Sequence, residues 1–474
     1  MLLLLLLLLG PQPSGAHPGL KMAVSSKGLD YVRNVVTDCV QEELLTAVIP
    51  DIEGKVCIGI GNVHYALSQM EVVKVDLPQP SVNFEENVGV RVEVSGLSIA
   101  ITGHWRTWFG IIKDGGTFEL ALFDVSSASL LQLGMDSQAH VSVGCLTCNA
   151  QIGRIDMRFH GGASFFLQTF VKLFPGYLKG LIEGHICPLL ETQTGKLEDM
   201  LATMNVNLHI DPNMIFNLSL TNAPLVQSSN MEMDLKGVFY SEQHPSEPPF
   251  PSQDFQLVPK ADYMISLGIS QFSLNTYTYV CLTAGLLQIN ITDKMIPPVF
   301  PLRLNTSSFG KLIPQLAKMF PDMLMVLQVF AAEAPAVSLQ MDSFSFLMST
   351  AINAYAINNT ILIPLFTLNL TTQFSGNLSI ANEKVVGTLE FDKLKLSLVS
   401  SKIGTFQTLA LEKVMVQGVK TFLIPALNAK LQRGIPLPVM KGVAFVQPVL
   451  QIQQGFLAVF SDVKMRDSST EREL

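Results

Sequence analysis

The chain lacks an internal hydrophobic run that could span a membrane. A spanning helix needs roughly 20 consecutive apolar residues, and the most apolar internal stretch, residues 164–184, is interrupted by Lys172, Pro175 and Lys179. The strongest apolar block is the N-terminal MLLLLLLLLG. It is too short to span a bilayer, but it suits the hydrophobic region of a signal peptide. We therefore predict a signal peptide over residues 1–16 and secretion to the extracellular space.

Cysteine is scarce, with six in 474 residues, which excludes a dense disulfide scaffold. Cys145 and Cys148 are separated by two residues, and His185 and Cys187 follow further along the chain. This pattern allows a zinc site of three thiolates and one imidazole. It also allows one structural disulfide to Cys187, which an oxidising compartment favours.

Signatures of common enzymes are missing. The sequence has no G-x-S-x-G elbow, no H-E-x-x-H motif and no Walker loop, and its eight histidines are scattered. We predict no enzymatic activity, no catalytic residue, no metal, no cofactor and no nucleic-acid partner. A lipase is the remote alternative, because an apolar tunnel would suit one.

Apolar residues, by contrast, are abundant: they form 48% of the chain, against 15% charged residues and a net charge of −8. Residues 164–184 read SFFLQTFVKLFPGYLKGLIEG and are apolar on almost every side of a helix. Such a helix must be covered by a protein core, a bilayer or a bound lipid. Because a permanent span is excluded, a core and a bound lipid remain.

Proline is concentrated in residues 241–260, where five prolines stand among polar residues. Regular structure is hard to sustain there, so we predict a linker between an N-terminal domain, residues 17–240, and a C-terminal domain, residues 261–474. Each half repeats one order: an amphipathic helix, β-rich segments and a second apolar helix. The expected segments are residues 25–50, 90–103 and 164–184 in the first half, and residues 307–321, 374–399 and 409–432 in the second, before a strand-like tail at residues 448–463.

This order predicts an α+β fold of two twisted antiparallel sheets, each packed with two long helices. Strongly twisted sheets tend to curl into barrels or sandwiches, so each domain is expected to be a barrel. Secretion also predicts glycan acceptors at Asn-x-Ser/Thr. These occur at Asn217, Asn290, Asn305, Asn358, Asn369 and Asn377.

Several long blocks resemble one known family. HPGLKMAVSSKGLDY, VSVGCLTCNAQI, LKGVFYSEQHPSEPPFP, GISQFSLNTYTYVCLTAGLLQINITDKMIP, FGKLIPQLAKMFPDM and LNAKLQRGIPLPV are similar to successive blocks of the bactericidal/permeability-increasing and lipopolysaccharide-binding proteins. Phospholipid transfer protein and cholesteryl ester transfer protein are more distant relatives. The resemblance implies a boomerang of two pseudo-symmetric barrels joined by a central sheet, with an apolar lipid pocket beneath each barrel.

The resemblance also implies a function and a disulfide. We expect a monomer that holds phospholipid as a ligand and binds lipopolysaccharide and the bacterial outer membrane in innate immune defence. The family disulfide corresponds to Cys148 and Cys187. It leaves the pairing of Cys39, Cys57, Cys145 and Cys281 unassigned.

Apolar side chains on the helices are the candidates for lining the pockets, where each buried methylene contributes roughly 0.8 kcal/mol. The alternative is that they only fill the core. The predicted lining residues are Leu29, Val32, Val36, Val40, Phe170, Phe174, Leu178, Leu312, Leu316, Val419 and Leu423.

The charge distribution departs from that of the bactericidal family members, whose N-terminal half is cationic. Here residues 17–240 contain 14 Lys and Arg against 23 Asp and Glu, a net of −9, while residues 241–474 have a net of +1. Attraction to an anionic surface should therefore be weak. This balance supports the alternative function, a phospholipid carrier without lipopolysaccharide affinity.

Two segments that the resemblance places at the tip of the first barrel retain cations and aromatic residues. Trp105 and Trp108 suit contact with a membrane interface, unless their loop folds onto its own barrel. His64 and His104 would add positive charge in acid. The predicted site for anionic head groups consists of Lys55, Arg106 and Lys113.

Overall fold

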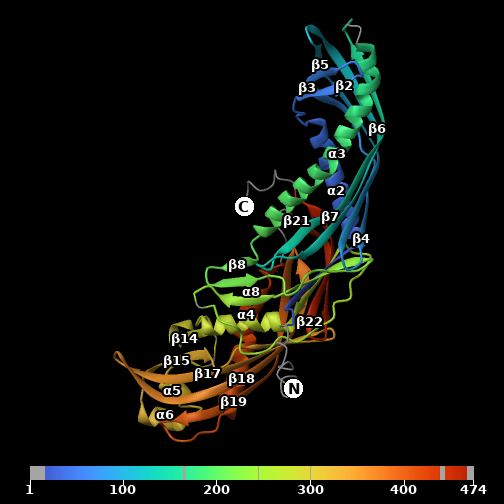
Figure 1. Cartoon of the computed structure of the whole chain (residues 1–474). Coiled ribbons are helices and arrows are strands. Elements are labelled where there is room, and N and C mark those ends of the chain that lie inside the picture. Colours follow the sequence, from blue (N-terminus) through green and yellow to red (C-terminus); the bar gives the residue numbers. More distant parts are fainter. Residues whose placement is uncertain are drawn as a thin grey trace, which may run out of the picture.

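The protein is an elongated, bent molecule with two arms and a central sheet between them (Figure 1). The computed structural model describes residues 17–163, 167–243, 245–298, 300, 302–437 and 443–466. The predicted signal peptide lies outside the described residues. This architecture confirms the predicted α+β class of two curled antiparallel sheets.

The first arm is a six-stranded antiparallel sheet that packs against two helices, α2 (Ser26–Leu45) and α3 (Leu167–Ala202). Both helices run along the arm in Figure 1. The strands, in chain order, are β2 (Ile52–Cys57), β3 (Asn62–Asp76), β4 (Ser81–Glu85), β5 (Gly89–Phe109), β6 (Ile112–Met135) and β7 (Val141–His160).

The apolar segment around α3 supplies the core of this arm. Phe170, Phe174 and Leu178 recur every four residues and therefore share one face of the helix. Their exposed fractions are 1%, 0% and 0%. They pack in one cluster with Tyr65 and Trp105 from the sheet, and the Tyr65 and Phe174 rings are 4.8 Å apart. The protein core covers this face of the helix.

The second arm repeats the plan with another curled antiparallel sheet. Its last helical segment, predicted at residues 409–432, is α7 (Leu409–Gly418), a π-helical turn (Val419–Leu423) and α8 (Ile424–Leu431). Pro425 has no N–H to donate to the preceding turn, which accounts for the π geometry there. The strands are β14 (Gln288–Thr292), β15 (Leu324–Ala331), β16 (Ala336–Gln340), β17 (Ser343–Asn358), β18 (Ile361–Ala381), β19 (Lys384–Ser401) and β20 (Ile435–Pro436).

The central sheet joins strands from both halves in the order β10-β11-β1-β13-β22-β21. A separate three-stranded sheet has the order β12-β9-β8, and residues 245–260 contain no helix or strand. The strands of the central sheet are β1 (Leu20–Ser25), β10 (Leu225–Val226), β11 (Asn230–Leu235), β13 (Ile265–Ser270), β21 (Val443–Gln453) and β22 (Phe456–Met465), and those of the small sheet are β8 (Asn207–Asp211), β9 (Met214–Asn217) and β12 (Val238–Ser241).

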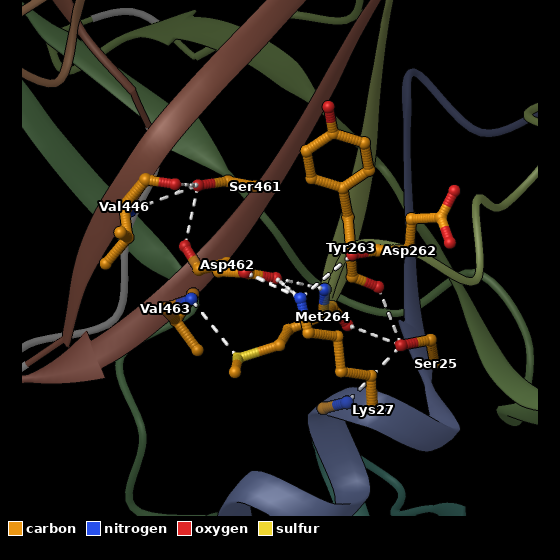
Figure 2. A network of polar contacts seen from close by, with 10 residues as sticks. Ser25, Lys27, Asp262, Tyr263, Met264, Val446, Ser461, Asp462 and Val463 are labelled. Carbon is orange, nitrogen blue, oxygen red and sulfur yellow. Dashed lines mark hydrogen bonds and ion pairs between the residues drawn. The ribbon is translucent and has the colours of Figure 1, made fainter.

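A polar network fastens the start of α2 to the central sheet (Figure 2). Lys27 Nζ lies 2.7 Å from Asp462 Oδ2 on β22 and donates to the carbonyl of Asp262 at 2.9 Å. Asp462 also accepts from the Met264 N–H at 3.1 Å, and the Ser25 hydroxyl donates to the Tyr263 carbonyl at 2.7 Å. Segments from both halves of the chain therefore meet at one point.

The structure corrects one predicted helix. Residues 307–321 do not form a continuous amphipathic helix but two short ones, α5 (Thr306–Phe309) and α6 (Pro314–Met319). The ring of Pro314 disfavours helical geometry at the residue before it, Ile313. Ile313 accordingly has φ −129° and ψ 84°.

The counterpart of α2 in the second half is α4 (Gln271–Thr283), which the sequence analysis missed. Both helices follow directly on a strand of the central sheet, and a serine caps each one. Ser25 accepts from the Gly28 N–H, and Ser270 accepts from the Ser273 N–H. Such caps satisfy backbone donors that have no partner within the helix.

Candidate functional site

A disulfide joins the sheet and the long helix of the first arm. Cys148 on β7 is bonded to Cys187 on α3, with their Cα atoms 5.7 Å apart. This confirms the predicted pair and rules out the zinc interpretation, because the bond uses two of its three thiolates. Cys39 and Cys57 are exposed thiols, and Cys145 is partly buried.

The second arm encloses a cavity of about 800 Å³. Its wall combines the inner face of the sheet, the α7–α8 segment and the chain between α4 and α5. Val419 and Leu423 line it, as predicted, together with apolar residues such as Phe300 and Phe366. The volume falls within the range of roughly 300–1,000 Å³ that is typical of ligand pockets.

A partly exposed ion pair supports one wall of this cavity. Asp293 accepts from Arg303 Nη2 at 2.6 Å and from the N–H of Leu304, a lining residue, at 2.8 Å. The hydrogen bond from Arg303 holds the pKa of Asp293 below its usual value, and the bond from Leu304 adds to this effect. The charged carboxylate therefore fixes the backbone of the cavity wall.

Several predicted lining residues prove to be core residues. Phe170, Phe174, Leu178 and Leu316 are at most 1% exposed, so protein atoms surround them on every side. None of the four is among the described lining residues of the cavity in the second arm, and all four belong to the hydrophobic cores. Leu312 is partly buried against the core of the second arm and is not among the lining residues of its cavity.

The apolar side of α2 is uncovered. Val32, Val36 and Val40 are 52%, 51% and 38% exposed, and Leu29 is partly buried. On α3, Leu173 and other apolar side chains are also exposed. Both helices of the first arm therefore present apolar surface that no described part of the chain covers.

Strand register brings the predicted tip cations together. Lys55 on β2 pairs with His64 on β3, His64 with Trp108 on β5, and Trp108 with Lys113 on β6. Directly paired residues share one face of a sheet, so the four side chains form a cross-strand row. The His64 and Trp108 rings stack with centroids 5.4 Å apart. Arg106 lies two residues before Trp108 and therefore shares this face.

The three tip cations are exposed, and none forms an ion pair with any residue that the structure describes. Lys55 and Lys113 are at the two ends of the cross-strand row, and Arg106 pairs with Ala66 in the next row. The sheet thus presents three positive charges on one face, and the exposed Glu53 shares that face in the row of Arg106.

Trp105 does not face a membrane. It is 1% exposed, packs in the core of the first arm and donates from Nε1 to the His160 carbonyl at 3.3 Å. Side chains alternate between the faces of a strand, so Trp105 points inward while Trp108 lies on the outer face. Trp108 is partly buried on strand β5 and is not in a loop.

Among the described residues of the two hairpin ends at the tip, the exposed apolar side chains are two isoleucines that the sequence analysis missed. Ile111, at the turn between β5 and β6, is 97% exposed, and Ile60, between β2 and β3, is 65% exposed. A Cβ atom on Gly61 would lie 2.8 Å from the Phe109 ring, so the two hairpin ends lie together. The sequence signal that could have identified them is an isoleucine next to glycine in a predicted turn, as in Gly59-Ile60-Gly61 and Gly110-Ile111.

The glycan acceptors differ in accessibility. Asn290, Asn358 and Asn377 are exposed. Asn305 caps α5 by accepting from the Ser308 N–H at 2.7 Å. Asn217 and Asn369 are partly buried. Glycosylation at all six positions stays a prediction.

The described residues contain neither a helix long and apolar enough to cross a membrane nor a group of three or more potential metal ligands.

Comparisons with known proteins cover nearly the whole chain. Residues 28–204 match the N-terminal domain model of the LBP / BPI / CETP family, and residues 208–465 match its C-terminal domain model. The sequence is 34% identical to the bactericidal permeability-increasing protein of Sebastes schlegelii over 97% of this chain and 98% of that protein. It is 28% identical to human lipopolysaccharide-binding protein over 98% and 97% of the two chains.

A crystal structure of lipopolysaccharide binding protein superimposes with a TM-score of 0.60 and 26% identity, over 95% of this chain and 99% of that one. The match extends over both arms and the central sheet. Family models, full-length relatives and fold agree, and the chain belongs to the LBP / BPI / CETP family.

Proposed function

We propose that this protein is a secreted lipid-binding protein of innate immune defence, which holds phospholipid acyl chains and binds bacterial lipopolysaccharide. The observation that carries the proposal is the apolar cavity of about 800 Å³ in the second arm. The mechanism is binding and transfer, with acyl chains buried and head groups at the mouth. It needs no covalent chemistry and no partner subunit.

Burial of hydrocarbon supplies the affinity. At roughly 0.8 kcal/mol per methylene, an acyl chain of ordinary length gains on the order of 10 kcal/mol on leaving water. The exposed apolar surface of α2, at Val32, Val36 and Val40, supports a second lipid site in the first arm. We therefore expect about two phospholipids per chain.

Lipopolysaccharide is assigned to the cationic face of the tip. Lys55, Arg106 and Lys113 are exposed there without an ion pair to any described residue, and charge-assisted hydrogen bonds to phosphate are strong. Ile60 and Ile111 would enter the acyl region beside them. Relatives named for bactericidal activity and for lipopolysaccharide binding support this assignment.

The second candidate is a phospholipid carrier without lipopolysaccharide affinity. The net charge of −9 over residues 17–240 favours it, because a negative field repels an anionic surface. Exchange of phospholipid between vesicles, without lipopolysaccharide binding at any salt concentration, would establish this function.

Native mass spectrometry of protein secreted from a eukaryotic host tests the lipid sites. Ala426 lines the cavity and is exposed, so Ala426→Trp should fill the cavity and remove one phospholipid per chain. Ala429 is exposed on the same helix but is not a lining residue, so Ala429→Trp is the matched control. Recovery of folded, lipid-free wild-type protein would refute the proposal.

A further inference from the structure

The cavity of the second arm has one charged residue among its described lining residues, Lys430. All other described lining residues are uncharged, and the polar ones among them are Gln288, Thr350 and Thr372. The two threonines are 4% and 1% exposed, so they offer little polar surface. Among these described residues a bound lipid therefore meets one formal charge, and that charge is positive.

Lys430 lies at the mouth of the cavity. It is an exposed residue in the last turn of α8, where the partial negative charge of the helix end favours a cation. Leu286, Ile289 and Met295 also line the cavity and are 52%, 50% and 50% exposed, which marks them as rim residues. Lys430 lines the same cavity and is likewise exposed, so it too is a rim residue.

The ammonium of Lys430 has no ion-pair partner among the described residues. A lysine can lay its aliphatic stem along an apolar wall and keep its charged end at the surface. When a lipid fills the cavity, water at the rim is partly displaced. An anion beside the ammonium then compensates the charge.

We propose that Lys430 is a specificity-determining residue, which makes the C-terminal cavity prefer lipids whose head group carries a net negative charge. This inference rests on the proposed function, since it requires that the cavity holds a lipid. Phosphatidylcholine has a phosphate too, but its quaternary ammonium is repelled by Lys430. Phosphatidylglycerol and a fatty acid lack that second charge.

The expected preference is modest, because a partly exposed ion pair is weak. About a fivefold enrichment of the anionic lipid is the upper range for such a pair. Added salt should reduce the enrichment, since exposed charges are screened over about 8 Å at physiological ionic strength.

The test offers the protein equimolar mixtures of lipids in vesicles. One arm uses phosphatidylcholine with phosphatidylglycerol, and the other uses phosphatidylcholine with oleate. The protein is separated from the vesicles, and mass spectrometry of the extracted lipid gives the amount per chain and the head-group ratio. In Ala426→Trp the cavity is filled, so the head-group ratio reports the lipid site of the first arm alone. The difference between this ratio and that of wild type is the contribution of the cavity.

Lys430→Gln should abolish the preference with the total lipid unchanged, and Lys430→Arg should retain it. Lys413→Gln is the control, because Lys413 is exposed on α7 and is not a lining residue. Enrichment of phosphatidylglycerol assigns an anionic phospholipid, and enrichment of oleate alone assigns a fatty acid. Bound lipid without enrichment in either arm, or enrichment that survives Lys430→Gln, overturns the inference. Absence of bound lipid would instead contradict the proposed function.

Discussion

Glu183 Oε1 on α3 accepts a hydrogen bond from the backbone N–H of Ile152 on β7 at 2.7 Å. The second arm has the same arrangement, since Glu412 on α7 accepts from the Leu396 N–H of β19 at 3.0 Å. β7 is the last strand of its sheet, and β19 pairs on its outer side with only two residues of β20. In both arms a helical carboxylate accepts from a backbone donor at this side of the sheet, where a neighbouring strand is missing or short.

Removing one of these carboxylates should loosen its arm. Glu183→Ala leaves the partly buried Ile152 N–H without its acceptor, and an unsatisfied donor costs about 1–3 kcal/mol. Glu183→Gln should cost less, because the amide oxygen can still accept. The free energy of unfolding from denaturant titration measures both effects.

Glu191→Ala is the control for this experiment, because Glu191 is exposed on the same helix. It should leave the unfolding free energy within about 0.5 kcal/mol of wild type. Equal losses for Glu183→Ala and Glu191→Ala would show that the carboxylate does not hold the edge of the sheet.

The disulfide should stabilise the first arm further. Replacing Cys148 and Cys187 together by Ala should lower the free energy of unfolding by about 2–5 kcal/mol, as loss of a native bridge does. The exposed Cys39, replaced by Ser, serves as control. Identical unfolding curves for wild type with and without reductant would contradict a stabilising role.

Acid should destabilise the wall of the cavity in the second arm, because it protonates Asp293. Its pKa is lowered in the folded protein by the hydrogen bond from Arg303, relative to 3.8 for an ordinary aspartate. A lowered folded pKa means that the stabilisation is present above pH 3.8 and is lost as the pH falls through the folded value. Asp293→Asn should therefore lower Tm at neutral pH.

The difference in Tm between Asp293→Asn and wild type should shrink as the pH falls below 3.8. Asp342→Asn is a suitable control, since Asp342 is exposed and forms no ion pair with any residue that the structure describes. A constant difference in Tm from neutral to strongly acidic pH would mean that the charge of Asp293 is not what stabilises the wall.

The sequence predicts those elements whose local pattern agrees with their packing. The periodicity of α2 and the alternation within β5 are of this kind. The helix α4 fails this condition, because QFSLNTYTYVCLT is rich in β-branched and aromatic residues that favour strands. It is helical because tertiary packing buries Thr276 and Val280 against neighbouring elements.

The candidate site divides in the same way. The exposure of charged residues such as Lys55 and Lys113 was predictable, because a lysine near the end of a hairpin keeps its ammonium in solvent in either strand register. The orientations of Trp105 and Trp108 were not, since a shift of one residue exchanges the faces of a strand. Whether Leu316 fills the core or Val419 lines a cavity depends on the shape left between helix and sheet, and apolar character alone does not specify it.

The two isoleucines at the tip should insert into a lipid surface. Ile60→Ser with Ile111→Ser should weaken binding to anionic vesicles and leave Tm unchanged, because both side chains are largely exposed. Val399→Ser on the sheet of the second arm is the control, since Val399 is 63% exposed as well. Vesicle sedimentation measures the binding. If the double variant binds vesicles as wild type does, the tip does not enter the membrane.

The cations of the tip should determine the response to salt. Lipopolysaccharide binding is expected at low salt and should weaken as salt is added, because the three charges are exposed and therefore screened. Substituting Lys55, Arg106 and Lys113 by Gln should remove most of this binding. The phospholipid content should stay unchanged, because the cavity belongs to the other arm.

A control triple variant at Lys393, Lys395 and Lys402 removes the same number of exposed charges from the second arm. If the tip is the site, this variant binds lipopolysaccharide as wild type does, although its net charge is equally more negative. Equal weakening by both triple variants would show that binding follows net charge rather than the cross-strand row. If wild type binds none at any salt concentration yet transfers phospholipid, the net charge of −9 over residues 17–240 prevails over the three tip cations, and the protein is a carrier.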